Sequence, residues 1–398
     1  MIRHALQLIW NRKRSNALIL LEIFFSFLVV LVVATLAIYY WTGYRSPLGF
    51  DYRDVWGVEV DLRGQMEKGP GLDESELFQR LLREIGSLEP VEAVGGAFSV
   101  PYEGSTQTES AGEEGRNPLL FEVDRVTDGI AGVLRMETVR GRWFEPADAA
   151  LAWIPVVIDE DLARAKFGTA DPVGRTFREA AAGTRERRVI GVVRDFRRSG
   201  ELSARDNFLL ELWKPNEEER ALRSILIRLR PGTPAAFEQD LIARLRGVAR
   251  DADFEVRTLA QRRDDYFQSR LAPLLAGGTV AAFLLLMVGL GLVGVLWQNL
   301  IRRTREIGLR RAAGASRANL QRQILIEQLL LSTLGIGLAM VLAFQLPLLG
   351  VTRFVPAEAL AGGMVMATLV IYLLTALCAL YPSWMASRLP PAEALRYE

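Results

Sequence analysis

The chain has 398 residues and a formal net charge of +1, and half of its residues are apolar although 24% are charged. Its mean hydropathy of +0.15 fits neither a wholly soluble chain nor a wholly membrane-embedded one, so the apolar residues must be segregated. They gather in four runs, each long enough to cross about 30 Å of hydrocarbon as a helix. These predicted spans are residues 17–41, 273–297, 324–349 and 362–385. The composition therefore predicts an integral membrane protein.

Several kinds of chemistry are excluded by residue counts. The single histidine, His4, cannot build a zinc site with two histidines, and it is too far from the large polar region to serve a catalytic triad there. The lone cysteine, Cys378, lies inside the fourth run and has no partner for a disulfide. None of the four lysines follows a glycine, so no P-loop is present. We expect a chain without catalytic, cofactor-binding or metal-binding residues of its own.

Arginine and lysine predict the orientation. Residues 1–16 carry four basic residues and no acid, and their apolar positions share one helical face, so they predict an amphipathic helix lying along the inner leaflet. Residues 298–323 carry seven arginines against one glutamate. The positive-inside rule then places both termini and this loop in the cytoplasm of a cell whose inner membrane holds the protein. Residues 42–272 would lie outside, 350–361 would form a short outer loop, and 386–398 a cytoplasmic tail.

The outer region, 42–272, alternates strand and helix patterns, which predicts a mixed α/β domain. The predicted strands are 55–62, 91–100, 119–126, 154–158, 188–193, 224–229 and 254–259. The predicted helices are 73–85, 127–134, 159–167 and 234–248. Residues 103–117 and 179–187 are expected to be loops because they are rich in small and polar residues. From Leu259 through Phe267 a helix is expected to continue into the second span as a stiff stalk. The fold class is thus an α+β membrane protein with four spans and a large extracytoplasmic domain after the first.

The spans themselves predict packing rather than transport. Gly289, Gly291 and Gly294 spell a dinucleotide-binding pattern, but they lie inside an uncharged helix, where small residues favour close helix packing. Glu22 and Glu327 would sit near the inner interface, since each lies within a few residues of the start of its run. An ion pathway needs charges near the midplane, so the spans argue against a channel or a secondary transporter.

The segment from Arg302 to Ser316 is the most informative. It predicts a short cytoplasmic helix terminated by Gly314, with Ser316 as the N-cap of the next helix. The simplest alternative is a charged loop that only fixes topology.

Three motifs resemble one known family. Arg303, Glu306, Ile307, Gly308, Arg311, Ala312, Gly314 and Ala315 match the loop between the second and third spans of FtsX-type permeases of ABC transporters. The tail from Pro382 to Arg396 is similar to the ending of these permeases. Outside, Gly141-Arg142-Trp143-Phe144 with Asp148 resembles the MacB-type periplasmic core domain.

The resemblance implies a permease that dimerises, with an identical or a paralogous chain, and that docks an ABC ATPase. The docking residues would be Arg303, Glu306, Ile307, Gly308, Arg311, Gly314 and Ala315. MacB carries a fused ATPase domain that this sequence lacks, so we expect a separate ATPase subunit that binds ATP and magnesium. Further expected partners are membrane lipids and, by the same resemblance, a periplasmic adaptor and an outer-membrane channel. No nucleic acid is expected, because no aromatic residues are interleaved with the arginines.

The function implied is mechanotransmission, in which ATP-driven motion of the ATPase reaches the outer domain, for export of a drug, a peptide or another envelope substrate. Two alternatives remain open: a lipoprotein-releasing permease of the LolC/LolE type, and an FtsX-like regulator of an envelope hydrolase that has no cargo. The size of the outer region favours a transporter.

Overall fold

The computed structural model describes residues 13–64, 73–103, 107–111, 119–177, 186–203, 207–215, 222–302, 309, 316–345 and 355–388. The chain forms two compact units. Met1–Thr42 and Arg270–Glu398 form one, here called the membrane unit, and Gly43–Ser269 forms the other, the outer unit. Four long apolar helices and a mixed α/β region between the first two confirm the predicted fold class.

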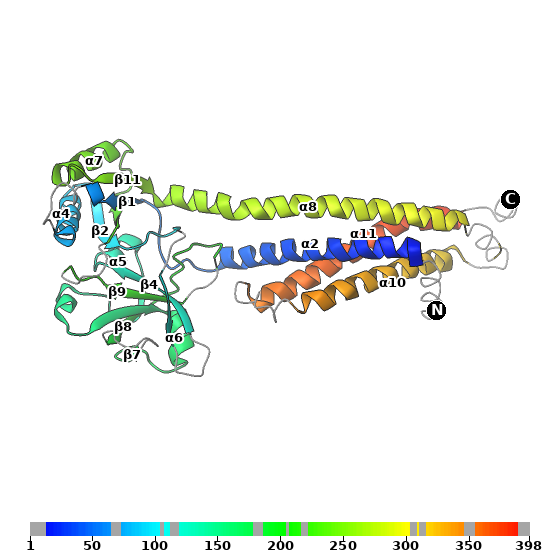
Figure 1. The fold of residues 1–398 in the computed structure, drawn as a ribbon, viewed down its shortest axis with the longest axis horizontal. Coiled ribbons are helices and arrows are strands. Elements are labelled where there is room, and N and C mark those ends of the chain that lie inside the picture. The colour runs from blue at the N-terminus through cyan, green and yellow to red at the C-terminus, as the bar shows by residue number, and fades with distance from the viewer. Residues whose placement is uncertain are drawn as a thin grey trace. The chain divides into compact units, whose positions relative to one another are not determined.

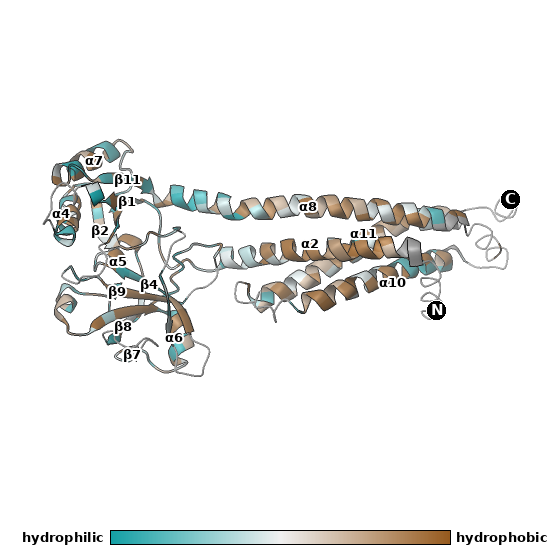
Figure 2. Cartoon of the chain, in the orientation of Figure 1, coloured by the Kyte–Doolittle hydropathy of each residue, from teal (hydrophilic) through white to brown (hydrophobic). Residues whose placement is uncertain are grey.

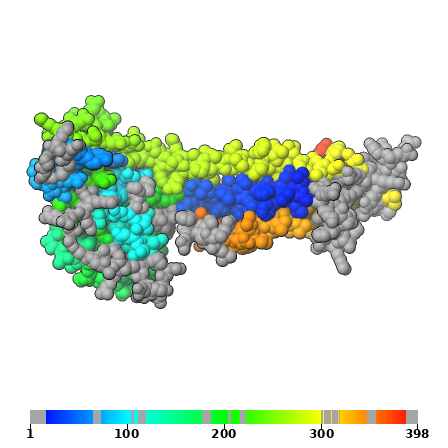
Figure 3. All heavy atoms as spheres, viewed as in Figure 1, coloured from blue at the N-terminus to red at the C-terminus, as the bar shows by residue number. Residues whose placement is uncertain are grey.

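The membrane unit is built from four helices that are apolar and long enough to span a bilayer. They are α2 (Lys13–Arg45), α8 (Leu259–Arg302), α10 (Arg317–Ala343) and α11 (Ala357–Arg388). Brown, hydrophobic residues cover most of their length in Figure 2, while the first turns of α8 are hydrophilic. The predicted interfacial helix over residues 1–16 lies almost wholly outside the described residues. One buried core contains side chains from all four helices, and α2 and α8 lie side by side in Figure 3.

Small residues let these helices approach closely, as the sequence predicts. Ala339 and Ala379 are fully buried, and the hydroxyls of Ser332 and Thr375 join α10 to α11 by a 2.8 Å hydrogen bond. A side chain at Gly291 would meet the carboxylate of Glu22. Hydrogen bonds between buried hydroxyls stabilise helix pairs in lipid, where water cannot compete for them.

The outer unit contains one twisted, mixed sheet, shown with its helices in Figure 1. Among the described residues eleven strands join it, in the order β11-β1-β10-β2-β4-β9-β6-β8-β5, with β3 beside β4 and β7 beside β8. The strands are β1 (Val55–Asp61), β2 (Val91–Ala97), β3 (Gln107–Ala111), β4 (Leu119–Val126), β5 (Thr138–Gly141), β6 (Ile154–Asp159), β7 (Thr176–Phe177), β8 (Arg187–Val193), β9 (Phe208–Leu212), β10 (Ser224–Leu229) and β11 (Asp253–Thr258).

Two hydrophobic cores divide this sheet into two lobes. In lobe A, helices α4 (Glu74–Gly86) and α7 (Phe237–Val248) cover β1, β2, β10 and β11. In lobe B, helix α6 (Glu160–Phe167) packs on the sheet formed by β3 to β9. The lobes meet at a short seam where Ala97 of β2 pairs with Val126 of β4. Helix α5 (Ile130–Leu134) follows β4 and packs on β2.

A buried arginine in lobe A bonds to α5 and to the segment before β1. Arg228 of β10 is 1% exposed, and its guanidinium donates to the carbonyls of Val133, Arg53 and Asp51 at 2.6, 3.0 and 2.8 Å. Burial lowers the pKa of Arg228, and the nearby carboxylate of Asp51 opposes that shift. These three bonds fix α5 and the segment before β1 to the sheet.

Local capping motifs begin or end two helices, and the N-cap predicted at Ser316 is confirmed. The Asp159 side chain accepts from the backbone amide of Leu162 at the start of α6, and Gly168 ends that helix with a φ of 63°. The Ser316 side chain likewise accepts from the amide of Asn319 at the start of α10. Each motif needs only neighbouring residues, and for this reason it is readable from sequence.

The predicted loop over 103–117 is partly wrong, because Gln107–Ala111 forms β3 and pairs with β4. The predicted loop over 179–187 overlaps the start of β8 at Arg187, and its residues 179–185 lie outside the described residues. Three further strands, β5, β7 and β9, were not predicted. Strand β9 contains Glu211, which is buried beside Arg125 on the neighbouring strand β4 and Arg187 on β8, two strands away. A charged residue is paired inside the sheet here, and its partners are distant in sequence.

Asp124 of β4 gives stability a dependence on pH. It is 4% exposed and accepts from the amide of Ser99 at 3.3 Å. Burial raises its pKa from 3.8 to about 7, although the charge of Arg198 opposes the rise. A carboxyl whose pKa is raised on folding binds its proton more tightly in the folded state, so stability falls as pH rises from about 4 through about 7.

We therefore expect Asp124→Asn, which keeps an acceptor for Ser99, to flatten this dependence. Between pH 5 and pH 8 the natural chain should lose about 2–3 kcal/mol more stability than the variant. Unfolding of the purified full chain in detergent, followed at both pH values, measures the difference. Parallel pH profiles for the two proteins would contradict the assignment.

Candidate functional site

The predicted docking residues, Arg303, Glu306, Ile307, Gly308, Arg311, Gly314 and Ala315, lie outside the described residues. The structure does describe the part of the outer unit where the chain arrives from α2 and departs through α8. We call it the junction. It consists of residues 43–52, 100–103, the loop 195–203 after β8, and the first turns of α8.

Arg197 holds the end of α2 to the 195–203 loop. It is 4% exposed, and its guanidinium donates to the carbonyls of Gly43 at 2.6 Å, Glu201 at 3.0 Å and Ser203 at 2.6 Å. Its own amide donates to Leu48 at 3.0 Å. Gly43 is required sterically, because a Cβ there would overlap the carbonyl oxygen of Glu201. The end of α2 is thus fixed by a charged donor in a water-poor site, where such bonds are strongest.

Glu201, from the same loop, holds the start of α8. One carboxylate oxygen accepts from Nε of Arg263 at 2.7 Å, and the other accepts from the hydroxyl of Tyr102 at 3.3 Å. The Glu201 side chain is 9% exposed and that of Arg263 20%, so water screens this pair less than a surface pair. Burial, and then the negative charge of Glu201, raise the pKa of Tyr102, so the phenol stays protonated and can donate.

Aromatic rings pack around this ion pair. The guanidinium of Arg263 lies 4.4 Å from the ring centroid of Phe267 and 5.0 Å from that of Tyr52. Phe267 makes an edge-to-face contact with Tyr44, the residue after Gly43, at 6.4 Å. Tyr102 meets Tyr266 of α8 at 6.0 Å and Phe50 at 5.8 Å. Offset and edge contacts of this kind add to the area that the rings bury.

Backbone geometry at the junction is specialised. Tyr102 has a φ of 68°, a left-handed conformation that is uncommon for a residue with a side chain. Its ring lies against Gly200, whose φ is 85°, and a Cβ at Gly200 would come within 2.6 Å of that ring. The surrounding hydrogen bonds, including the Tyr102 amide to the Arg198 carbonyl at 2.9 Å, hold this arrangement.

The junction is held together by charged hydrogen bonds, the Arg263–Glu201 ion pair and edge-to-face rings. Within the described residues no three His, Cys, Asp or Glu side chains are grouped to hold a metal ion. Two helices that continue by chain connection into the membrane unit are both bonded to one loop of the outer unit. Displacement of either helix end therefore has to move this loop or break its bonds.

The Gly141-Arg142-Trp143-Phe144 motif lies outside the junction, in the turn after β5. Arg142 binds both oxygens of Asp148 at 2.6 Å each, and the Trp143 indole donates to the carbonyl of Asp128 at 2.7 Å. The bond to Arg142, opposed by burial, lowers the pKa of Asp148. This motif builds a rigid turn and contains no reactive group.

Sequence reasoning missed the junction. Arg197, Glu201 and Tyr102 stand in a stretch without periodicity, and their partners are far away along the chain. One local signal was available in the sequence, the pair Arg197-Arg198 followed by Gly200, which is typical of a turn. In the structure both arginines are buried.

Comparison with known families agrees with the motifs. Residues 27–244, more than half of the chain, match the MacB-like periplasmic core domain, and residues 278–391 match the FtsX-like permease C-terminal region. The chain therefore belongs to the family of MacB-like, FtsX-type permeases of ABC transporters. Its four apolar helices and this family place it among inner-membrane permeases.

Curated relatives include a macrolide export ATP-binding/permease protein MacB of Bordetella avium, 29% identical over 69% of this chain and 43% of the relative. Another is a probable syringafactin export ATP-binding/permease protein of Pseudomonas syringae, 28% identical over 71% of this chain and 44% of the relative. The chain thus spans less than half the length of these relatives. Among solved structures, the periplasmic region of MacB from Actinobacillus actinomycetemcomitans has a TM-score of 0.39 at 15% identity, covering 55% of this chain and 94% of that one.

The junction predicts a specific loss of stability. Glu201→Gln keeps an oxygen for Tyr102 but leaves the half-buried Arg263 without its counter-charge, so we expect the free energy of unfolding to fall by about 1–3 kcal/mol. The matched control is Glu76→Gln, which breaks an exposed pair with Arg80, both side chains being more than half exposed, and should change stability by less than about 0.5 kcal/mol.

Unfolding of the full chain in detergent measures both variants. Hydrogen exchange should also become faster at residues 43–50 and in the first turns of α8 for Glu201→Gln alone. Equal and small effects of the two substitutions would show that the junction pair contributes no more than a surface pair.

Proposed function

We propose that this permease transmits motion from an ABC ATPase to its outer unit, and that the outer unit, rather than a path between the spans, acts on the exported or regulated substrate. The observation that carries the proposal is the junction, where the Arg197 and Glu201 bonds tie the end of α2 and the start of α8 to one loop. Helix α8 supports it further, because it runs without a break from Leu259 to Arg302.

The spans offer little for a transport path. In the apolar parts of the four described helices the charged side chains are Glu22 and Glu327, and each lies in the N-terminal half of its helix, α2 or α10. Glu327 accepts from Gln323 one turn earlier at 3.2 Å. Polar groups deeper in the bundle, such as Ser332 and Thr375, bond to one another. These features favour a bundle that holds its shape over one that opens for cargo.

We further propose that the permease works as a dimer with both termini and residues 298–323 in the cytoplasm, and that it exports a drug, a peptide or another envelope substrate. The names of the curated relatives support export as the general task. That the ATPase is a separate polypeptide stays a prediction of the sequence, as do an adaptor and an outer-membrane channel.

A flexible insertion tests the transmission. We expect Gly-Ser-Gly-Ser inserted after Gln268, within α8, to uncouple the outer unit while basal ATP hydrolysis persists. The readout is the distance between spin labels on the two outer units of the dimer, reconstituted with its ATPase. Labels are placed at Arg164→Cys in a Cys378→Ala background, because the Arg164 side chain is 70% exposed.

In the natural chain, ATP should change this distance, and the insertion should abolish the change. The control is the same insertion at Gly232, an exposed turn residue with a φ of 86° and no atoms within 4 Å of an added Cβ, which should leave the change intact. A nucleotide-dependent change that survives the insertion after Gln268 would rule out transmission through α8.

Docking of the ATPase at residues 303–315 can be tested separately. Reversing Glu306 to Arg, or replacing Gly314 by Val, which disfavours positive φ, should abolish stimulation of ATP hydrolysis by the permease. Both variants should still insert into the membrane. Glu358→Arg, in the first turn of α11, is the control. Normal stimulation of ATP hydrolysis in both the Glu306 and the Gly314 variant would show that residues 303–315 only fix the topology.

A further inference from the structure

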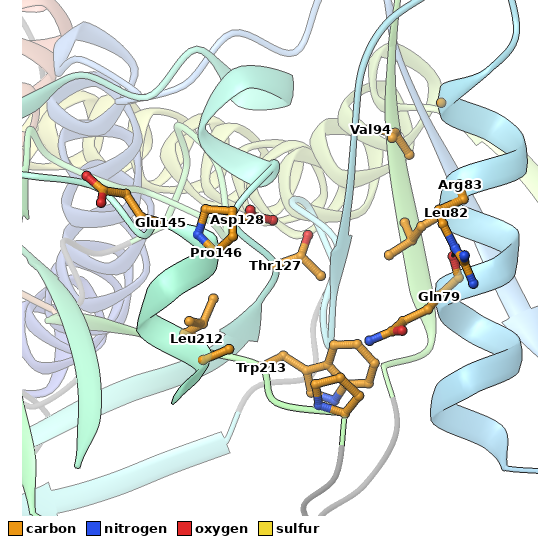
Figure 4. A pocket seen from close by; sticks show the side chains of 13 residues that line it. Gln79, Leu82, Arg83, Val94, Thr127, Asp128, Glu145, Pro146, Leu212 and Trp213 are labelled. Atoms are coloured by element: carbon orange, nitrogen blue, oxygen red, sulfur yellow. Dashed lines mark hydrogen bonds between the residues drawn. The ribbon is translucent and has the colours of Figure 1, made fainter. Parts of the chain in front are cut away.

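A cavity of about 480 Å³ opens between the two lobes of the outer unit. Figure 4 shows Gln79, Leu82 and Arg83 of α4 on one side, and Asp128 and Glu145 on the opposite side, with Trp213 between them at one end. The first three belong to lobe A, and the two carboxylates follow β4 and β5 of lobe B. The volume lies in the range of sites for small molecules.

The two walls of the cavity carry opposite charges. Arg83 and Asp128 are both exposed, and no ion pair involves either of them in the part of the chain that the structure describes. Within that part, the Arg83 guanidinium has one weak bond, to the carbonyl of Gln79 at 3.5 Å. Glu145 is 4.0 Å from Arg142, whose guanidinium is already bound in bidentate fashion by Asp148. A cation would therefore find two carboxylates on one wall, and an anion would find a guanidinium on the other.

The end of the cavity between these walls is apolar and rigid. Trp213 is 7% exposed and packs edge-to-face on Phe78 of α4 at 5.8 Å. Its amide donates to the carbonyl of Val126 at 2.8 Å, so the residue is fixed at the seam of the lobes. Leu82 and Leu212 extend this apolar surface. An aromatic floor with a few convergent polar groups is the usual composition of a ligand site.

We propose that this cavity binds a small amphipathic zwitterion: a molecule whose cationic group meets Asp128 and Glu145, whose carboxylate meets Arg83, and whose apolar part lies on Trp213. Such a ligand bridges the lobes, because its carboxylate contacts Arg83 of lobe A while its cation contacts Glu145, which follows β5 of lobe B. A purely cationic amphipath would leave Arg83 unmatched and bind less well. The site is independent of the proposed transmission, since it requires only the outer unit.

The probe is the peptide acetyl-Lys-Leu-Phe with a free carboxylate, titrated calorimetrically into the full chain in lipid nanodiscs. Two analogues separate the charges: the carboxamide lacks the anion, and the norleucine form lacks the cation. We expect the free acid to bind, and each analogue to bind roughly tenfold more weakly, the effect of one charged hydrogen bond.

Variants then assign each charge to its wall. Arg83→Gln should weaken binding of the free-acid peptide, so that it binds no more tightly than the carboxamide. Asp128→Asn should weaken binding of the lysine peptide, so that it binds no more tightly than the norleucine form. The control is Arg80→Gln, on the same helix but outside the cavity, which should bind like the natural chain. Since all three residues are exposed, the variants should fold normally, as circular dichroism would verify.

Absence of binding to the natural chain at millimolar peptide would overturn the proposal. Binding that the Arg83 and Asp128 variants leave unchanged would place the peptide elsewhere and overturn it as well. Neither result bears on the spin-label experiment, so failure of this site and failure of transmission can be told apart.

Discussion

The hydrogen bonds of the Arg197 guanidinium join the end of α2 to the 195–203 loop of the outer unit. The guanidinium is buried, and it donates hydrogen bonds to the carbonyls of Gly43, Glu201 and Ser203 in place of water. Losing one acceptor would leave part of that charge unsatisfied, at a cost of about 1–3 kcal/mol. A small displacement of the α2 end is thus less costly if the 195–203 loop follows than if it stays behind. Glu201 joins the same loop to α8, because its carboxylate accepts a hydrogen bond from Arg263.

The junction also connects the lobes. Helix α8 follows β11 of lobe A directly, and Arg262 in its first turn binds Glu59 of β1 at 2.6 Å. The next residue, Arg263, binds Glu201 in a loop that follows β8 of lobe B. The start of α8 is therefore bonded to both lobes, whereas the cavity lies where the lobes meet only along a short seam. The bonded start of α8 and the short seam between the lobes thus occupy different places in one sheet.

Local chemistry could be predicted from the sequence, and long-range pairing could not. The role of Ser316 was predicted because a cap acts on neighbours within four residues, and the Asp159 and Gly168 caps of α6 are equally local. The four spans were readable because hydrocarbon imposes a length and a polarity on each helix. Strand β9 was missed because Glu211 interrupts its apolar run, and the arginines that neutralise it stand on β8 and β4.

The same limit explains why the junction was missed. Gly43 and Arg197 are separated by more than a hundred and fifty residues, and nothing near either predicts the other. The stiff start of α8 was foreseen, but the groups that hold it were not. For the docking residues from Arg303 to Ala315 the family motif remains the whole basis of the prediction.

The strand order has a consequence for how the chain folds. Lobe B is contiguous, from β3 to β9, whereas lobe A is assembled from β1 and β2 before it and β10 and β11 after it. Pairing of β2 with β10 must wait until Ser224–Leu229 has been synthesised, and it closes a long loop at an entropic cost that a folded lobe B would reduce. We expect lobe B to form first during translation, so that β4 offers Val126 as a template on which β2 and then lobe A are completed. Mutations that slow folding should accordingly concentrate in lobe B, and those that speed unfolding in lobe A.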